Sequence, residues 1–266
     1  MRIRLLSAAF TLSLLMLAVS GVQAQGAWGY CGYQNVMLDR LDELNRPALR
    51  SAVVIVLGDT AATNATCDQR KVWVDAIIFG PGNMQAEWNE GLKFSDAVKA
   101  LKMYLAQPNI GGVRVATIDN AFLEVYGRPT TTVEMLEWEP QVKAQTAWYA
   151  TIASAEIKKL NSNIGTRRNT TGRRPMVDQA YKTSMGRIAN DGESSYWLPR
   201  TEHYRLIVAA SRSWLYSDGG TKDLISTIKL ALATKNGAAP SEADVKAAII
   251  KFKGNAAKPI YAEMIK

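Results

Sequence analysis

The sequence predicts an all-α protein, a multi-helix array with a duplicated helix–loop–helix unit that is preceded by a helical N-terminal section. Three observations lead to this prediction. Apolar residues recur at helical spacing in nearly every segment. Almost no segment alternates apolar and polar residues as a half-buried strand would. Finally, two stretches that lie fifty-nine residues apart share one pattern, which indicates an internal duplication.

The first 24 residues have the composition of a secretory signal peptide. Arg2 and Arg4 precede an apolar run from Leu5 to Val19, and small residues lead up to Ala24. The run is shorter than the roughly 20 residues that a membrane span needs, and no later segment is long and apolar enough. We therefore expect cleavage after Ala24, no transmembrane span in the mature chain, and a periplasmic or secreted location.

The composition of the remaining chain is that of a folded, basic protein. Cleavage would remove Arg2 and Arg4, so that 30 basic residues face 24 acidic ones and the net charge falls from +8 to +6. About 240 residues with an ordinary hydrophobic content can bury a core. The basic excess attracts anions without specifying which.

Residues 25–110 are predicted to form the N-terminal helical section. Apolar residues recur at helical spacing from Met37 to Leu44, and Pro47 is expected to end that helix. The run from Ala52 to Leu57 fits a buried strand or a buried helix, and we favour a helix because its neighbours are helical. Two further helices are predicted in this section, over residues 71–79 and 96–106.

Cys31 and Cys67 are the only cysteines of the chain. In an oxidising compartment they are expected to form one disulfide, which closes a loop of about 37 residues. The alternative, a reactive thiol or a metal ligand, would need a nearby histidine, and His203 is the only one. A zinc site needs more histidine and cysteine than the chain has, so neither a metal nor a cofactor is predicted.

The first copy of the repeated unit covers residues 111–165. A helix over 113–126 is followed by Gly127, which is expected to end it in the left-handed conformation. Thr131 and Glu134 have the spacing of a capping box for a short helix that ends at Pro140. A long helix is predicted to follow over residues 142–160.

The second copy covers residues 166–218 and repeats this scheme. An exposed, arginine-rich loop is predicted over residues 161–175 and includes the start of this copy, and residues 219–266 form a C-terminal helical section. The predicted helices of this half follow in order: 176–185 before Gly186, a short one that carries Tyr196-Trp197, 202–216, 223–234 and 242–252.

The shared pattern has seven identities and three close replacements over twenty-three positions. We interpret the following residues as a structural motif: Asp119, Gly127, Arg128, Glu134 and Trp138 in the first copy, and Asp178, Gly186, Arg187, Glu193 and Trp197 in the second. The arginine after each glycine can bridge to the aspartate of its helix or to the glutamate of the next. The tryptophan is expected to bury its ring between the units. The alternatives are a binding role for the tryptophan and arginine faces, or catalysis.

The motif resembles a short helical repeat domain of unknown function that recurs in bacterial secreted and surface proteins, including haemolysin-type and glycan-associated ones. The second copy is the better match, through Ala180-Tyr181, Gly186-Arg187, Asp191-Gly192 and Tyr196-Trp197. The first copy has Thr131-Thr132 where the family has Asp-Gly. A weaker similarity links the pattern to helical linker domains of light-harvesting assemblies. Over residues 113–216, the resemblance implies a helical, extracytoplasmic scaffold or adhesive module without established catalytic residues.

Four arginines of the predicted loop form a candidate surface for an anion or a partner: Arg167, Arg168, Arg173 and Arg174. The ligand would be a protein partner or an anionic envelope polymer. Nucleic acid is not expected, because no aromatic residues are interleaved with the arginines. The alternative is a solvated loop that keeps the protein soluble.

No catalytic constellation stands out in the sequence. His203 has no serine or cysteine motif around it. A glycan hydrolase with paired carboxylates would draw on Glu87, Glu90, Glu134 and Glu139. A calcium-dependent module would draw on Asp191, Glu193 and residues 217–220, although the EF-hand spacing is missing.

The leading hypothesis is a non-catalytic, secreted or periplasmic helical scaffold or binding module, a subunit of an envelope-associated or extracellular assembly. It rests on the duplicated scaffold, the few catalytic residue types and the arginine cluster. Self-association into an oligomer is compatible with it. The alternative is a glycan-active hydrolase that uses paired carboxylates.

Overall fold

The computed structural model describes residues 28, 31, 36–162, 164, 167–253 and 260–266, and at residues 36–42, 167–171 and 253 the backbone alone. The predicted signal peptide lies outside these residues. The structure is 76% helical, with fourteen α-helices and no strand among the described residues. The predicted all-α class is therefore confirmed. No described helix is both long enough and apolar enough to cross a membrane.

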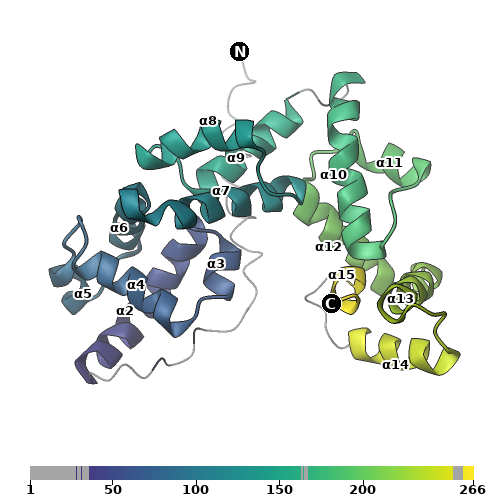
Figure 1. The fold of residues 1–266 in the computed structure, drawn as a ribbon, viewed down its shortest axis with the longest axis horizontal. Coiled ribbons are helices and arrows are strands. Elements are labelled where there is room, and N and C mark those ends of the chain that lie inside the picture. Colours follow the sequence, from purple (N-terminus) through teal and green to yellow (C-terminus); the bar gives the residue numbers. More distant parts are fainter. Residues whose placement is uncertain (1–27, 29–30, 32–35, 163, 165–166, 254–259) are drawn as a thin grey trace, which may run out of the picture. The chain divides into compact units, whose positions relative to one another are not determined.

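The chain divides into two compact units, described separately below. Unit 1 ends at Tyr104 and unit 2 begins at Leu105, a few residues before the end of the predicted N-terminal section. In its described part, unit 1 contains five helices, the last of which continues into unit 2 (Figure 1). They are α2 (Val36–Val56), α3 (Asp59–Thr63), α4 (Cys67–Ile78), α5 (Gln85–Glu90) and α6 (Phe94–Ala106).

The core of unit 1 shows why Pro47 does not end its helix. The run from Ala52 to Leu57 is helical, as favoured from the sequence, but it belongs to the same helix as residues 36–46. A proline inside a helix removes one backbone hydrogen bond. Here the turns after it carry Leu49, Val53 and Val56, all without exposed surface. The burial of this apolar face outweighs the cost of the proline, and the predicted helix end at Pro47 was wrong.

The predicted disulfide between Cys31 and Cys67 is present. It fixes the start of the described chain to the first residue of α4. Trp28 makes a second attachment, because its indole donates a hydrogen bond to the carbonyl of Ala62 (2.7 Å) and its ring stacks on Trp73 at 5.9 Å. Cys31 and Trp28 are therefore held to the rest of unit 1, the first by a covalent bond and the second by a buried aromatic contact.

Unit 2 is built from three successive helix triplets, each with a first, second and third helix. The first triplet is α7 (Gly111–Tyr126), α8 (Thr132–Lys143) and α9 (Tyr149–Asn161). The second is α10 (Arg167–Met185), α11 (Asp191–Trp197) and α12 (Tyr204–Tyr216). The third is α13 (Thr221–Asn236), α14 (Glu242–Lys253) and α15 (Ile260–Met264). A short 3-10 helix, η1 (Pro108–Ile110), precedes α7.

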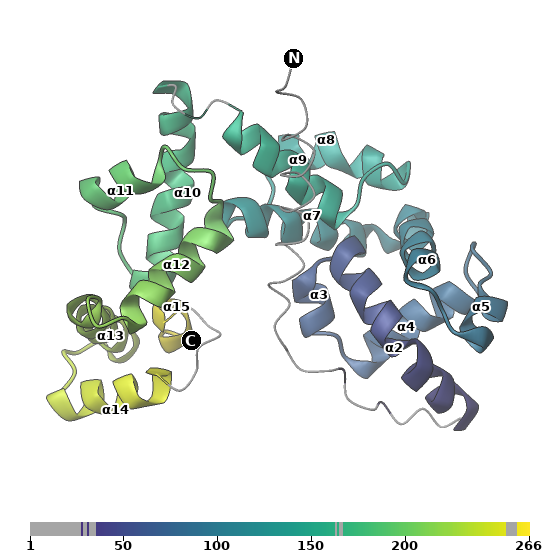
Figure 2. The ribbon, with the colours of Figure 1, turned by 180° about the vertical axis from the view of Figure 1, so that it is seen from behind.

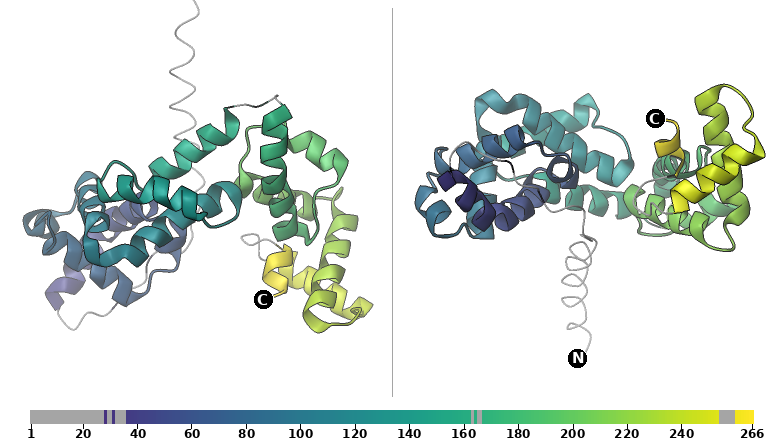
Figure 3. Two further views of the ribbon diagram at one scale, coloured as in Figure 1. Left: turned by 45° about the horizontal axis from the view of Figure 1, so that its top comes forward. Right: turned by 90° about the horizontal axis from the view of Figure 1, so that it is seen from below.

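The first and third helices form the packed centre of each triplet. Within the triplets, α7 packs on α9, α10 on α12, and α13 on α15. Each later third helix also packs on the first helix of the preceding triplet, α12 on α7 and α15 on α10. Figure 2 shows α11 and α12 on either side of α10, and Figure 3 shows the last triplet, coloured from light green to yellow, at the end of unit 2 that holds the C-terminus.

Two predicted boundaries in unit 2 were wrong. The short helix predicted to end at Pro140 runs on to Lys143, because Val142 beyond the proline is buried in the core. The long helix predicted over residues 142–160 is instead interrupted after Lys143, where Gln145 takes a left-handed backbone conformation (φ 61°). A new helix then starts at Tyr149.

The predicted exposed loop over residues 161–175 is also wrong in its second half. Helix α10 already begins at Arg167 and runs through Pro175. Buried residues on both sides of the proline hold this helix in place, among them Arg173 and Val177. The candidate arginine cluster therefore lies on a helix that packs against other helices.

Candidate interaction surface

The first helix of every triplet in unit 2 ends at a glycine in the left-handed conformation. The φ angles are 71° at Gly127, 76° at Gly186 and 70° at Gly237. Such an ending is nearly free of strain for glycine and costs other residues conformational energy. The predicted endings at Gly127 and Gly186 are confirmed.

Four residues after each glycine, a side chain caps the next helix. Thr131 and Asn190 each accept a hydrogen bond from the backbone N–H of the glutamate three residues on, and that glutamate accepts one from the N–H of the capping residue. Ser241 and Asp244 exchange the same pair of bonds in the third triplet. The capping box predicted for the first copy is confirmed, and the same box is found at all three places.

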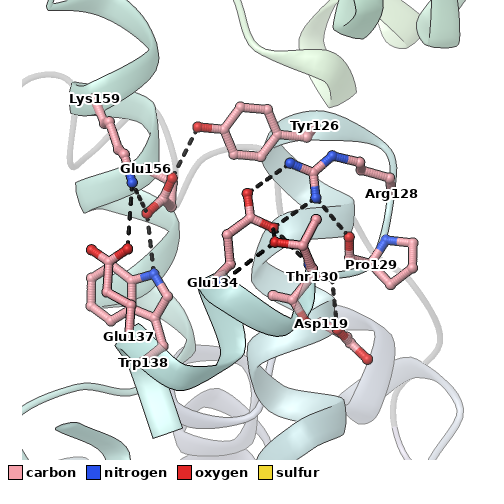
Figure 4. A network of polar contacts seen from close by, with 11 residues as sticks. Asp119, Tyr126, Arg128, Pro129, Thr130, Glu134, Glu137, Trp138, Glu156 and Lys159 are labelled. Carbon is pink, nitrogen blue, oxygen red and sulfur yellow. Dashed lines mark hydrogen bonds and ion pairs between the residues drawn. The ribbon is translucent and has the colours of Figure 1, made fainter.

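The arginine after the glycine binds the glutamate of this capping box. Nη1 and Nη2 of Arg128 lie 2.8 and 2.7 Å from the two carboxylate oxygens of Glu134 (Figure 4). Arg187 and Glu193 form the same two-pronged bridge, with 2.7 Å for both bonds. Of the two carboxylates considered from the sequence, the arginine thus selects the glutamate in each copy. The bridge fixes the loop between the first and second helices.

The two motif aspartates fix the same loop in different ways. Asp119 accepts hydrogen bonds from the backbone N–H (2.9 Å) and the hydroxyl of Thr130. Asp178 instead pairs with Arg174, at 3.1 Å, and Arg174 donates to the carbonyl of Ala189. Thr130 and Ala189 occupy the same position, three residues after the glycine. The loop is therefore attached to the aspartate directly in the first copy and through an arginine in the second.

Both motif tryptophans are buried, and both indole N–H groups have an acceptor. Trp138 donates to the buried carboxylate of Glu156 (3.1 Å), which also accepts a bond of 2.9 Å from the hydroxyl of Tyr126 (Figure 4). Burial and the charge of Glu156 raise the pKa of Tyr126, so its phenol stays protonated. Trp197 donates to the hydroxyl of Tyr181 (3.1 Å). These rings lie in the core of unit 2 and not along an open crevice.

The arginine cluster does not form the predicted four-residue surface. Arg173 has no exposed surface, and it donates hydrogen bonds of 2.6 Å to the side chain of Asn161 and to the carbonyl of Glu202. Arg174 is bound to Asp178, as described above. These two residues hold the start of α10 to its neighbours. The side chains of Arg167 and Arg168 lie outside the described residues.

Arg114 is a second buried arginine of unit 2, and it is not among the residues predicted from the sequence. It lies thirteen residues before Gly127, as Arg173 does before Gly186. It donates to the carbonyl of Leu105 (3.0 Å) and to that of Gln107, at the C-terminal end of α6. Arg173 binds the last residue of α9 as well, but through the side-chain oxygen of Asn161. Each arginine thus secures the end of the preceding helix, and the equal spacing to the glycine was the signal that could have revealed it.

The candidate acid Glu134 has properties opposite to those of a general acid. The hydrogen bonds from Arg128 and Thr131 lower the pKa of Glu134 to about 2, so the carboxylate stays ionised at neutral pH. A glycosidase acid needs a raised pKa to hold its proton. Glu193 is bound by an arginine in the same way, and Glu139 pairs with Lys143 at 2.9 Å. Glu87 lies on the exposed side of α5, as does Glu90.

His203 also takes part in a structural contact. Its Nε2 lies 3.2 Å from Glu124, and Arg205 donates to the same carboxylate at 2.9 Å. Burial raises the pKa of Glu124, but the bond from His203 and the charge of Arg205 outweigh this and leave that pKa lowered. These contacts join α12 to α7. Among the described residues, no group of three or more His, Cys, Asp or Glu side chains is arranged to hold a metal ion.

The outer face of α8 is the best candidate for binding another molecule. Val133 is 75% exposed and Leu136 is 70% exposed, and Pro140 is exposed on the next turn. Their spacing of three and four residues places them on one face of the helix. The opposite face carries the buried Trp138 and Val142. Helix α8 is therefore apolar both towards the core and towards solvent.

The comparisons with known proteins found no match: no family model, no curated protein and no solved structure is similar to this chain.

Proposed function

We propose that this protein is a non-catalytic helical scaffold or binding module, a subunit of a periplasmic or secreted assembly. The observation that carries the proposal is the apolar outer face of α8, formed by Val133, Leu136 and Pro140. A surface helix of a globular protein ordinarily turns polar residues to solvent. Contiguous apolar residues on a surface are typical of an interaction site.

The motif residues support this proposal because their polar groups are used inside the fold. Each arginine of the motif binds a glutamate that also caps a helix, and each tryptophan is buried with its N–H bonded. Side chains with these contacts build a scaffold and leave the surface to recognise the partner. The apolar character of the α8 face favours a protein partner over an anionic polymer, which would depend on the arginine cluster.

Two observations support the proposed periplasmic or secreted location. The first is the predicted signal peptide over residues 1–24. The second is the disulfide between Cys31 and Cys67, because structural disulfides persist in oxidising compartments such as the periplasm and the extracellular space.

A photo-crosslinking experiment tests the α8 face. A photoreactive amino acid is placed at position 133 in cells that make the protein, and the crosslinked product is identified by mass spectrometry. We expect a defined protein adduct, which disappears when Leu136→Asp is added. The matched control carries the same photoreactive residue at Ile250, which is 76% exposed on α14. Equal labelling from both positions, or none from position 133, would refute the proposal.

A further inference from the structure

The junction between successive triplets has the same geometry twice. The ring of Tyr204, the first residue of α12, lies against Gly127, and a Cβ atom at residue 127 would be 2.3 Å from the ring. The ring of Tyr261 in α15 lies against Gly186 at the same 2.3 Å. Each tyrosine thus covers the glycine at the end of the preceding triplet's first helix. Only a residue without a Cβ fits there.

The hydroxyl groups of these tyrosines make the same contact as well. The hydroxyl of Tyr204 donates to Thr183 (2.9 Å), and that of Tyr261 lies 3.3 Å from the hydroxyl of Thr234. Both threonines lie three residues before a glycine, Gly186 and Gly237. The tyrosine therefore binds its own triplet through the hydroxyl and the preceding triplet through the ring.

The last glycine has the same backbone conformation, but no described residue covers it. Among the residues that the structure describes, no atom lies within 4 Å of a Cβ added at Gly237. Leu230, Thr234 and Gly237 lie on the same face at the end of α13, because they are spaced four and three residues apart. Thr234 is exposed and Leu230 is 41% exposed. We call these three residues the open end of unit 2. In the first triplet the corresponding face of α7 carries Glu124, which contacts α12.

Helix α6 has the features of a third helix. It begins with the aromatic residue Phe94, as α9 and α12 begin with Tyr149 and Tyr204. The residues three, seven and eleven positions after this aromatic are buried in all three helices. They are Ala97, Leu101 and Leu105 in α6, Ile152, Glu156 and Leu160 in α9, and Ile207, Ser211 and Leu215 in α12. The end of α6 is also held by Arg114, as the end of α9 is held by Arg173.

The aromatic residue of α6 is exposed. Phe94 has 47% of its surface open to solvent, although the residues three, seven and eleven positions after it are buried. The two internal junctions show what such a residue binds in this fold, namely a left-handed glycine at the end of a first helix. The chain thus has, at the start of α6, an exposed aromatic residue at the position of Tyr204, which covers a glycine. It also has, at the end of α13, a left-handed glycine that no described residue covers.

We propose that the open end of one molecule binds the start of α6 of a second copy, with Phe94 over Gly237 and against Leu230. The interface repeats the internal junction between molecules. Lys93 precedes Phe94 as His203 precedes Tyr204, and Lys93 would face the neutral Thr234 where His203 faces Glu124. Because the two contacting surfaces differ, the association is head-to-tail, and it produces rings or filaments. It goes beyond the proposed function, since it names a second copy as partner and a surface that contains no residue of α8.

Sedimentation velocity of two variants and of their mixture tests this proposal. We expect the purified protein to associate with rising concentration, over about 1 to 500 µM. Phe94→Asp removes one surface and Leu230→Asp removes the other, so each variant alone should associate at least about tenfold more weakly. An equimolar mixture should form a dimer again, because Phe94 of the Leu230→Asp molecule meets the intact open end of the Phe94→Asp molecule.

The mixture decides between head-to-tail and symmetric association. If each surface instead contacted its own counterpart in a symmetric dimer, mixing the variants would restore nothing. A reciprocal dimer, in which Phe94 of each molecule meets the open end of the other, would regain one of its two contacts in the mixture, but the unaltered protein would then stop at the dimer. Ile250→Asp, on the exposed side of α14, is the matched control and should associate like the unaltered protein. Both substituted side chains are exposed, and unchanged circular dichroism shows that the variants fold. The proposal is overturned if the unaltered protein stays monomeric, if the mixture shows no dimer, or if Ile250→Asp weakens association equally. None of these results bears on the crosslinking from α8.

Discussion

The carboxylate of Glu156 accepts a hydrogen bond from the indole N–H of Trp138, 3.1 Å away, inside unit 2. The corresponding tryptophan of the second triplet, Trp197, donates to the hydroxyl of Tyr181 instead. Ser211 occupies the position of Glu156 in that triplet. The tryptophan is thus common to both triplets, whereas the group that satisfies its N–H is not. This difference leads to the first prediction.

Replacing Glu156 by leucine should destabilise unit 2. The substitution leaves the N–H of Trp138 and the hydroxyl of Tyr126 without their buried acceptor, which costs about 2–4 kcal/mol. Glu156→Gln keeps an acceptor oxygen and should cost less. Urea unfolding measures both, with Glu137→Gln as the control because Glu137 is half exposed. Equal losses for the leucine and glutamine variants would contradict the prediction.

The junction glycines should differ sharply in their tolerance of alanine. Gly127→Ala and Gly186→Ala place a methyl group 2.3 Å from a tyrosine ring, in addition to the strain of a positive φ. Gly237→Ala has the same strain but no clash. We expect the first two to lower the free energy of unfolding by at least about 2 kcal/mol more than the third. Thermal or urea unfolding of the three variants checks this, and equal effects would show that the tyrosines do not hold the junctions.

The bridge between Arg128 and Glu134 should make stability depend on acid pH. The folded pKa of Glu134 is lowered to about 2, so its contribution is present above the unfolded value near pH 4.5 and is lost as the pH falls towards 2. Because Arg128 is partly exposed, the contribution is on the order of 1 kcal/mol. Glu134→Gln should therefore reduce the difference in unfolding free energy between pH 6 and pH 3. An unchanged difference would show that other carboxylates cause the acid loss.

Removal of the disulfide should destabilise unit 1. The bond joins residues 36 positions apart, and closing a loop of this length contributes roughly 3–4 kcal/mol in the chain-entropy model. The double variant Cys31→Ser/Cys67→Ser should melt at a lower temperature than the unaltered protein. Adding a reductant should lower the melting temperature of the unaltered protein and leave that of the double variant unchanged. A reductant effect on the double variant would point to another cause.

Features that depend on neighbouring residues were predictable from the sequence. The left-handed ends at Gly127 and Gly186 and the capping box of Thr131 and Glu134 follow from residue types at fixed spacing, and the structure has them. The disulfide followed from a count of two cysteines. The predicted effect of the prolines was wrong, because a helix continues through a proline when the turns after it are buried. Pro47, Pro140 and Pro175 all lie inside helices whose later turns reach the core.

Features that depend on distant partners were not predictable. The charged neighbours of Arg173 in the sequence predict exposure, yet its side chain is buried and binds the carbonyl of Glu202, which lies 29 residues further on. The third triplet was missed because Ala238 and Ala248 replace the arginine and the tryptophan of the motif. Of the motif, the third triplet keeps the spacing of Gly237, Ser241 and Asp244. Three residues are too few to reveal a repeat in the sequence. The pairing of Tyr261 with Gly186 becomes visible only in three dimensions.

The tyrosine-on-glycine contact makes the length of the array adjustable. If residues 167–218 were inserted a second time after residue 218, the new Tyr204 equivalent would meet Gly186, and the new Gly186 equivalent would meet Tyr261. Both ends of the insert would therefore find the neighbour that the original chain provides. A gene that repeats this segment would therefore encode a longer array, with one more helix triplet for each repetition.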